Sequence, residues 1–277
     1  MRSAAERGAN GTSPDRKFAR LRGARRVWAV ASIHARARRL AHLHDAISER
    51  FQDGDRVVYL GDYVGKGDAV LATVDELLDF RRRVLGRRSA FACDVVFLRG
   101  AQEEMWQKLL QLQFAPNPSE VLQWTVRAGM ESTIRAYGGD LHRGFAACRD
   151  GPRMIARWTG ALRSAMNAVP GHTALFLALR HAAFTEEHRA LFIHAAIDPS
   201  RPLAAQGDAF WWGREEILDL RAPFEGFRRV IRGVGRERPG VIEREFAVSL
   251  GGGVEHDCRL ISACFAVDGT ILDVVEA

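Results

Sequence analysis

Five short turns follow apolar segments of the chain and carry side chains that could do chemistry. They are residues 31–35 (ASIHA), 61–67 (GDYVGKG), 99–103 (RGAQE), 194–198 (HAAID) and 232–234 (RGV). These turns supply imidazole, carboxylate and guanidinium groups, which can ligate divalent metals, move protons or bind anions. Whether the groups meet depends on the elements that precede each turn.

The segments in front of the first three turns predict a parallel sheet. Buried strands are expected over 27–30, 56–60 and 94–98, with amphipathic helices between them. We expect Asp68 to cap the second helix, whose apolar stripe begins at Val70. Because ligands collect at the carboxyl ends of parallel strands, this β-α-β-α-β order should bring the turns to one edge.

The remainder of the chain predicts a helical insertion and a second set of strands. Residues 102 to about 188 are expected to be mainly helical, with breaks at glycine and proline. Strands are predicted again over 191–194 and 229–231, and a C-terminal hairpin should turn at Asp268-Gly269. The predicted fold class is therefore α/β, one domain over 27–277 with a two-sheet core.

The five turns resemble the serine/threonine protein phosphatases of the calcineurin-like metallophosphoesterase superfamily. In that superfamily the corresponding turns read GDxHG, GDxxDRG, GNHE, a lone histidine and GH, in this order. Residues 124–138 (WTVRAGMESTIRAYG) and 208–218 (DAFWWGREEIL) resemble the bacterial branch. The resemblance covers about residues 27–277 and implies an α/β/β/α fold in which two sheets are flanked by helices.

The resemblance also implies a site for two metals, and half of its ligands are missing here. His34, Asp62 and His194 match ligand positions, and the other three positions hold Ser32, Ala101 and Val234. Alanine and valine offer no donor, and a neutral hydroxyl holds a hard cation weakly. We therefore expect no resident cofactor, or at most a divalent metal such as manganese, iron or zinc at partial occupancy.

Gln102 stands where the resemblance places the histidine that protonates the leaving group, so no catalytic residue is predicted. A glutamine side chain neither gains nor loses a proton at neutral pH. The aspartate that orients this histidine in the family is also absent, because Gly65 takes its place. The two losses together predict an enzyme homologue that is inactive or strongly impaired.

Anion-binding groups persist around the same turns. Lys66 replaces an arginine of the family motif, Arg214 matches its phosphate-contacting arginine, and Arg99 and Arg232 flank the strand ends. Positive charge without metals can still attract a phosphate. The leading hypothesis is a pseudophosphatase that binds a phosphorylated or acidic partner; the alternative is an active phosphoesterase with a non-standard, single-metal site.

Several of these residues also have structural interpretations. His34, Asp62 and His194 could be buried groups that only satisfy hydrogen bonds. The 61–67 turn is one residue short of a nucleotide-binding loop, and the Gly251–Gly253 run suits close backbone turns. A cluster of arginines at the end of the second helix is interpreted as a solvated helix terminus; its members are Arg81, Arg82, Arg83, Arg87 and Arg88.

Composition limits the remaining possibilities. The chain has 277 residues, 47% of them hydrophobic, and a net charge of +6. Residues 1–26 hold eight of the basic residues against two acidic ones, which accounts for the whole excess and predicts a disordered basic tail. Nucleic-acid binding is expected only weakly, through that tail. Four separated cysteines predict no disulfide or zinc site, and the lack of a signal segment or membrane span predicts a cytoplasmic protein.

Overall fold

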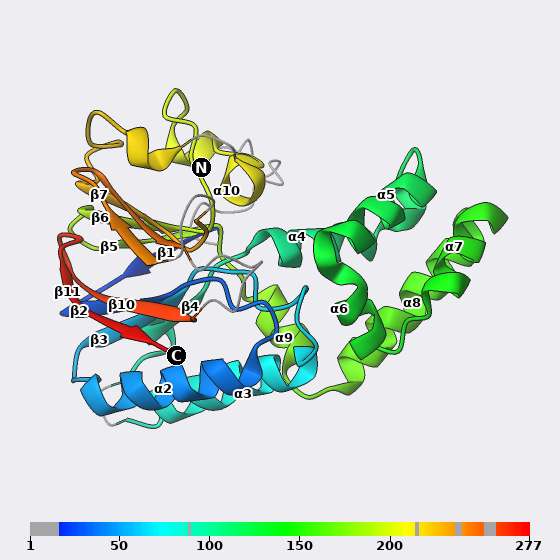
Figure 1. Cartoon of the computed structure of the whole chain (residues 1–277), viewed down its shortest axis with the longest axis horizontal. Coiled ribbons are helices and arrows are strands. Elements are labelled where there is room, and N and C mark those ends of the chain that lie inside the picture. The colour runs from blue at the N-terminus through cyan, green and yellow to red at the C-terminus, as the bar shows by residue number, and fades with distance from the viewer. Residues whose placement is uncertain (1–16, 88–89, 214–215, 236–239, 252–258) are drawn as a thin grey trace, which may run out of the picture.

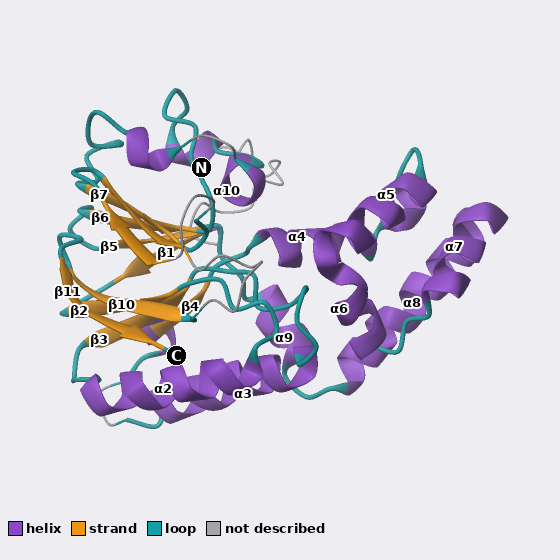
Figure 2. Cartoon of the chain, in the orientation of Figure 1, coloured by secondary structure: helices purple, strands orange, loops and turns teal. Residues whose placement is uncertain are grey.

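The computed structural model describes residues 17–87, 90–213, 216–235, 240–251 and 259–277. Two β-sheets lie face to face, with helices on the outer side of each (Figure 1). The chain termini of the described part lie on this sandwich, and a group of helices extends away from it. Figure 2 shows the separation of strands and helices into these layers.

The five-stranded sheet carries the first three turns. Its strands, in spatial order, are β11 (Ile271–Glu276), β10 (Ile261–Ala266), β2 (Arg26–Val30), β3 (Asp55–Tyr59) and β4 (Val95–Phe97). β2, β3 and β4 run parallel to one another, as the sequence predicts. Their carboxyl ends therefore share one edge, where the turns after them meet.

The six-stranded sheet contains two predicted strands and four that sequence patterns did not reveal. Its order is β1 (Phe18–Leu21), β5 (Ala182–Thr185), β6 (Ala190–Ile193), β7 (Arg229–Arg232), β9 (Ala247–Gly251) and β8 (Gly240–Glu243). β6 and β7 are parallel, so the turns after them also share an edge. The missed strands are four or five residues long, too short for a period-two pattern to stand out.

Three apolar clusters hold the layers together. The cluster between the sheets includes Val58, Phe192 and Phe265, all fully buried. The cluster outside the five-stranded sheet packs it against α2 (Ala37–Arg50) and α3 (Val70–Leu85). The third covers the six-stranded sheet with the segment around α10 (Ala209–Trp212). The predicted α/β/β/α arrangement is confirmed.

The insertion is helical, as expected, but ends earlier than predicted. Its main helices are α4 (Ala101–Leu109), α5 (Pro118–Thr125), α6 (Glu131–Ala136), α7 (Leu141–Asp150), α8 (Pro152–Ala168) and α9 (His172–Leu177). Figure 1 shows α5, α7 and α8 projecting from the sandwich. β5 then occupies part of the range 102–188, because four residues between Ala182 and Thr185 pair with both β1 and β6.

Two further expectations need correction. Residues 18–21, inside the expected tail 1–26, form β1 and pair with β5, so the ordered fold begins before residue 27. Residues 1–16 lie outside the described part. Asp68 does not cap α3: the N-cap is Ala69, and no side chain accepts a hydrogen bond from the first turn.

No helix in the described ranges combines the length and apolarity needed to cross a bilayer.

Candidate functional site

The turns after β2 and β3 have an unusual backbone. His34, Ala35, Asp62 and Lys66 all have left-handed conformations, with φ between 52° and 60°. Left-handed conformations are uncommon for residues other than glycine and persist only where the surroundings enforce them. Their concentration in two adjacent turns marks this edge of the sandwich as the candidate site.

Glu103 fixes the turn after β3. Its buried carboxyl group accepts hydrogen bonds from the backbone N–H groups of Asp62 (2.8 Å), Tyr63 (2.8 Å) and Gly100 (2.9 Å). Gly61 is required beside it, because a β-carbon there would lie 2.6 Å from the α-carbon of Gly100. Sequence reasoning assigned Glu103 no role. The available signal was its position three residues after Gly100, at the start of α4, where a carboxylate typically satisfies free N–H groups.

The structure brings together the three residues predicted as metal ligands. His34 Nε2 lies 3.7 Å from Asp62 Oδ2, and His194 Nε2 lies 3.5 Å from Asp62 Oδ1. All three residues are buried, with at most 5% of their surface exposed. Both distances exceed those of hydrogen bonds, so the three groups face one another without direct bonds.

Hydrogen bonding determines which nitrogen of His194 faces Asp62. Nδ1 lies 2.7 Å from the carbonyl oxygen of Leu60, and because a carbonyl only accepts, Nδ1 carries the proton. In the neutral ring Nε2 is then an acceptor that points toward a carboxylate oxygen. Only a proton on Nε2 or a cation between the groups makes such a contact attractive.

The electrostatics of the cluster place its negative charge on Asp62. Burial lowers the pKa of His34 to about 4, against the opposing attraction of Asp62. Burial raises the pKa of Asp62, but His194, His34, the Gln102 N–H and Lys66 together outweigh it and lower that pKa. Burial and the charge of Asp62 raise the pKa of Glu103 to about 8. Of the two buried carboxyl groups, Asp62 and Glu103, Asp62 is therefore the one that carries the negative charge.

Gln102 fills the space beside Asp62. Its backbone N–H donates to Asp62 Oδ1 (2.8 Å), and its side-chain Nε2 donates to the carbonyl of Ala128 (3.1 Å) in the insertion. A β-carbon on Gly65 would lie 2.0 Å from Gln102 Oε1, so residue 65 can only be glycine while this side chain is in place. The glycine at position 65 thus has a steric reason: it leaves room for the Gln102 side chain.

Comparison with solved structures identifies the fold. No family model matches the sequence, and no curated protein is significantly similar to it. A crystal structure described as a candidate diadenosine tetraphosphatase superposes with a TM-score of 0.53 at 19% identity, covering 94% of this chain and 98% of that one. The chain has the calcineurin-like metallophosphoesterase fold.

Two other similar structures superpose less well. A metallophosphoesterase from Sphaerobacter thermophilus gives a TM-score of 0.47 at 14% identity, covering 92% of this chain and 88% of that one. A protein serine/threonine phosphatase from Saccharomyces cerevisiae gives 0.45 at 11% identity, covering 89% and 76%. At these scores only the first comparison supports the fold.

The described residues do not fit the two-metal centre of the metallophosphoesterase fold. Ala101 and Val234 supply no donor, and the Gln102 N–H occupies one face of Asp62 Oδ1. The Ser32 hydroxyl is buried without a hydrogen-bond partner in the described chain, and it is uncharged. No group of three or more His, Cys, Asp or Glu side chains within the described ranges is arranged to hold a metal. The donor set is too small for two ions, since catalytic sites typically use at least three protein ligands for each metal.

The predicted phosphate-binding residues differ in their surroundings. Lys66 is exposed next to the cluster, and its charge acts on both Asp62 and His34. Arg99 is bound to Glu104 (2.9 Å), and Arg232 to Glu216 (2.7 Å) and Ser249 (3.0 Å). Arg214 lies outside the described residues, as do His256, Asp257 and the last two glycines of the 251–253 run. Among the described candidates, Lys66 has the most accessible charge.

Proposed function

We propose that this metallophosphoesterase-fold protein is a pseudophosphatase that binds a phosphorylated or acidic partner without hydrolysing it. The observation that carries the proposal is the position and the fixed side chain of Gln102. It stands where the family has its proton donor, is 3% exposed, and is held by hydrogen bonds to Asp62 and Ala128. An amide cannot protonate a leaving group, and this one is fixed in place.

The charge of the site supports binding of an anion at its mouth. Lys66 presents an ammonium group beside a buried cluster whose charge lies on Asp62. No carboxylate in the described part of the chain forms an ion pair with Lys66, whereas Arg99 and Arg232 already have carboxylate partners. A phosphate at the mouth would therefore contact Lys66 first, with Arg214 proposed as a second contact.

Hydrolysis of an aryl phosphate tests the proposal directly. Purified protein should show negligible turnover of p-nitrophenyl phosphate with manganese, zinc, iron or magnesium. Asp62→Asn should leave this background unchanged. Metal-dependent turnover that Asp62→Asn abolishes would reject the pseudophosphatase.

Calorimetry with inorganic phosphate and with phosphoserine tests the binding part. Weak binding is expected, and Lys66→Met should reduce the affinity at least threefold while Lys66→Arg retains it. Arg157→Ala is the matched control, because Arg157 is an exposed residue on α8. An unchanged affinity in Lys66→Met would remove Lys66 from the site.

One observation favours a second candidate, an active phosphoesterase with a single metal. His194 Nε2 faces Asp62 Oδ1 at 3.5 Å and His34 Nε2 faces Oδ2 at 3.7 Å, and a cation shared with Asp62 would make these contacts attractive when the rings are neutral. Such an ion would supply a Lewis acid and an activated water when bound. Elemental analysis separates the candidates: near-stoichiometric metal favours the enzyme, and metal-free protein that binds phosphate favours the pseudophosphatase.

A further inference from the structure

A groove of about 930 Å³ lies between the outer strands of the two sheets. One wall is β1, the outer strand of the six-stranded sheet, and the other is β4, the outer strand of the five-stranded sheet. Helices α3 and α9 contribute the remaining sides through residues such as Leu78 and Leu175. The groove is separate from the candidate site, which lies beyond the carboxyl end of β4.

The backbone of β4 is open toward this groove. Leu98 N–H donates to Tyr59 of β3, so the alternate residues Val95 and Phe97 direct their backbone groups away from β3. The Phe97 carbonyl accepts a hydrogen bond from Arg180 N–H, so the unpaired part of the edge ends there. Phe97 N–H and both backbone groups of Val95 form no hydrogen bond with described residues, so they can pair with an added strand.

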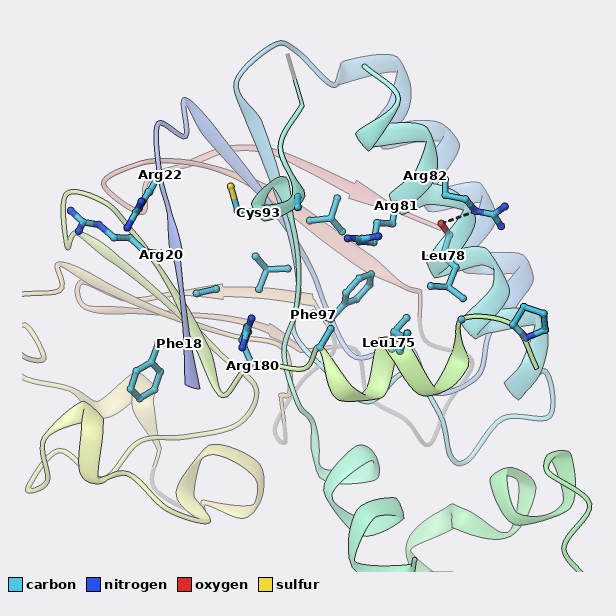
Figure 3. A pocket seen from close by; sticks show the side chains of 18 residues that line it. Phe18, Arg20, Arg22, Leu78, Arg81, Arg82, Cys93, Phe97, Leu175 and Arg180 are labelled. Carbon is cyan, nitrogen blue, oxygen red and sulfur yellow. Dashed lines mark hydrogen bonds between the residues drawn. The ribbon is translucent and has the colours of Figure 1, made fainter. Parts of the chain in front are cut away.

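The groove is apolar at its base and basic around its rim. Val95, Val96 and Phe97 are buried apolar residues, whereas five lining residues are arginines and none is acidic. Those arginines are Arg20, Arg22, Arg81, Arg82 and Arg180. Figure 3 shows Arg22 and Arg81 on opposite sides of the groove, with Cys93 and Phe97 between them.

Two of these arginines have charge to offer a ligand. Arg20 is paired with Glu186 at 3.3 Å and Arg82 with Asp79, but Arg22 and Arg81 form no ion pair with a described residue. The arginines at the end of α3, which the sequence analysis interpreted as a solvated helix terminus, therefore have different roles. Arg82 and Arg83 pair with carboxylates of their own helix, and Arg81 turns into the groove.

Taken together, an open strand edge, an apolar floor and a basic rim select one kind of occupant. We propose that the groove binds an extended acidic peptide of a partner protein, which adds a strand to β4 and meets Arg22 and Arg81 with its carboxylates. The chain's own residues 1–16 do not fit, because they hold three arginines against one glutamate and one aspartate. A small anion would use the charge but neither the strand edge nor the apolar floor.

Fluorescence anisotropy with three labelled peptides tests the proposal. The first is an eight-residue peptide in which glutamate alternates with valine, and the second replaces glutamate with lysine. The third keeps the side chains of the first but is N-methylated at alternate amides. The first peptide should bind saturably, and its affinity should fall as salt is added. The second should not bind, and N-methylation should lower the affinity at least tenfold because it removes the strand's donors.

Groove variants locate the binding. Arg22→Glu combined with Arg81→Glu should lower the affinity for the glutamate-valine peptide at least tenfold. Ala174→Trp, at an exposed lining position of α9, should do the same by filling the groove without changing its charge. Arg157→Glu is the control, because it removes an exposed arginine outside the groove. Bound peptide should also slow hydrogen exchange at the Val95 and Phe97 amides.

The proposal would be overturned by no saturable binding, by equal binding of the lysine peptide, by equal binding of the N-methylated peptide, or by binding that the groove variants leave unchanged. If Ala174→Trp instead abolished self-association in sedimentation, the occupant would be a second copy of the chain, and the acidic-peptide assignment would be wrong. Lys66→Met should lower the affinity for phosphate but not the affinity for the peptide. The experiments can therefore reject the peptide groove and the pseudophosphatase independently of each other.

Discussion

Gln102 Oε1 occupies the position that a side chain on Gly65 would need, at 2.0 Å from the place of its β-carbon. Residue 65 also has φ = 76°, in the left-handed region. A side chain at 65 and Gln102 in its present position therefore exclude each other, so residue 65 can gain a side chain only if Gln102 moves or is replaced.

A double-mutant cycle measures this dependence. Gly65→Ala should destabilise the fold by about 2 kcal/mol, from left-handed strain and the clash with Gln102. Gln102→Ala removes the clash, so the cost of Gly65→Ala in that background should fall by roughly 1 kcal/mol. Urea denaturation gives each free energy of unfolding. Gly160→Ala, in open space on α8, is the control and should be neutral or slightly stabilising.

An additive cycle would show that Gln102 moves freely when residue 65 gains a side chain. The contact between them would then have no part in fixing the site.

Some of this site could be predicted from sequence and some could not. The meeting of the turns that carry His34, Asp62 and His194 could be predicted, because apolar strands directly precede these turns and parallel strands bring such turns together. Their role as metal ligands is implied only by the resemblance to the phosphatases. The carboxylate partners of Arg99 and Arg232 depend on side-chain packing, which residue spacing does not encode. β1 escaped prediction because Phe18–Leu21 is a strand only by pairing with β5, more than 160 residues later.

Glu103→Gln should loosen the turn that carries Asp62. Both carboxyl oxygens of Glu103 accept from these three backbone N–H groups, whereas a glutamine has one oxygen, so its NH₂ group would face some of the donors. The expected loss is about 1–3 kcal/mol of unfolding free energy, since a buried donor is left unsatisfied. Thermal and urea denaturation would measure it.

Glu131→Gln provides the comparison, because it removes only an exposed pair with Arg135. Its effect should stay below about 1 kcal/mol. If the two variants lost equal stability, Glu103 would not be organising the Asp62 turn.

Adding donors should create metal affinity that the native site lacks. Ser32→Asp with Ala101→Asn supplies two oxygen ligands next to Asp62, and Ser32 already holds a buried hydroxyl without a partner in the described chain. Manganese affinity measured by calorimetry should rise at least tenfold. Asp62→Asn in the same background should reverse the gain; a gain that survives it would place the metal elsewhere.

The stability of the fold should fall in acid through His181. Burial, with the charges of Arg99 and Lys17, lowers the pKa of His181 from 6.5 to about 4. Below pH 6.5 the unfolded chain takes up a proton that the folded chain resists, so this contribution is complete above pH 6.5 and is lost as the pH falls toward 4. His181→Phe, in a pocket of aromatic rings, should show a smaller decrease in urea midpoint across that window. Parallel pH profiles for the two proteins would mean that other groups cause the decrease.

The cysteines should differ in reactivity and report on the groove. Cys93 is exposed and lines the groove, whereas burial raises the pKa of the Cys264 thiol to about 12. Iodoacetamide at pH 8, followed by mass spectrometry, should modify Cys93 at least tenfold faster than Cys264, because only the thiolate reacts. The glutamate-valine peptide should then slow alkylation of Cys93 while leaving Cys148, on α7, unchanged. Peptide that binds without protecting Cys93 would place its binding site outside the groove between β1 and β4.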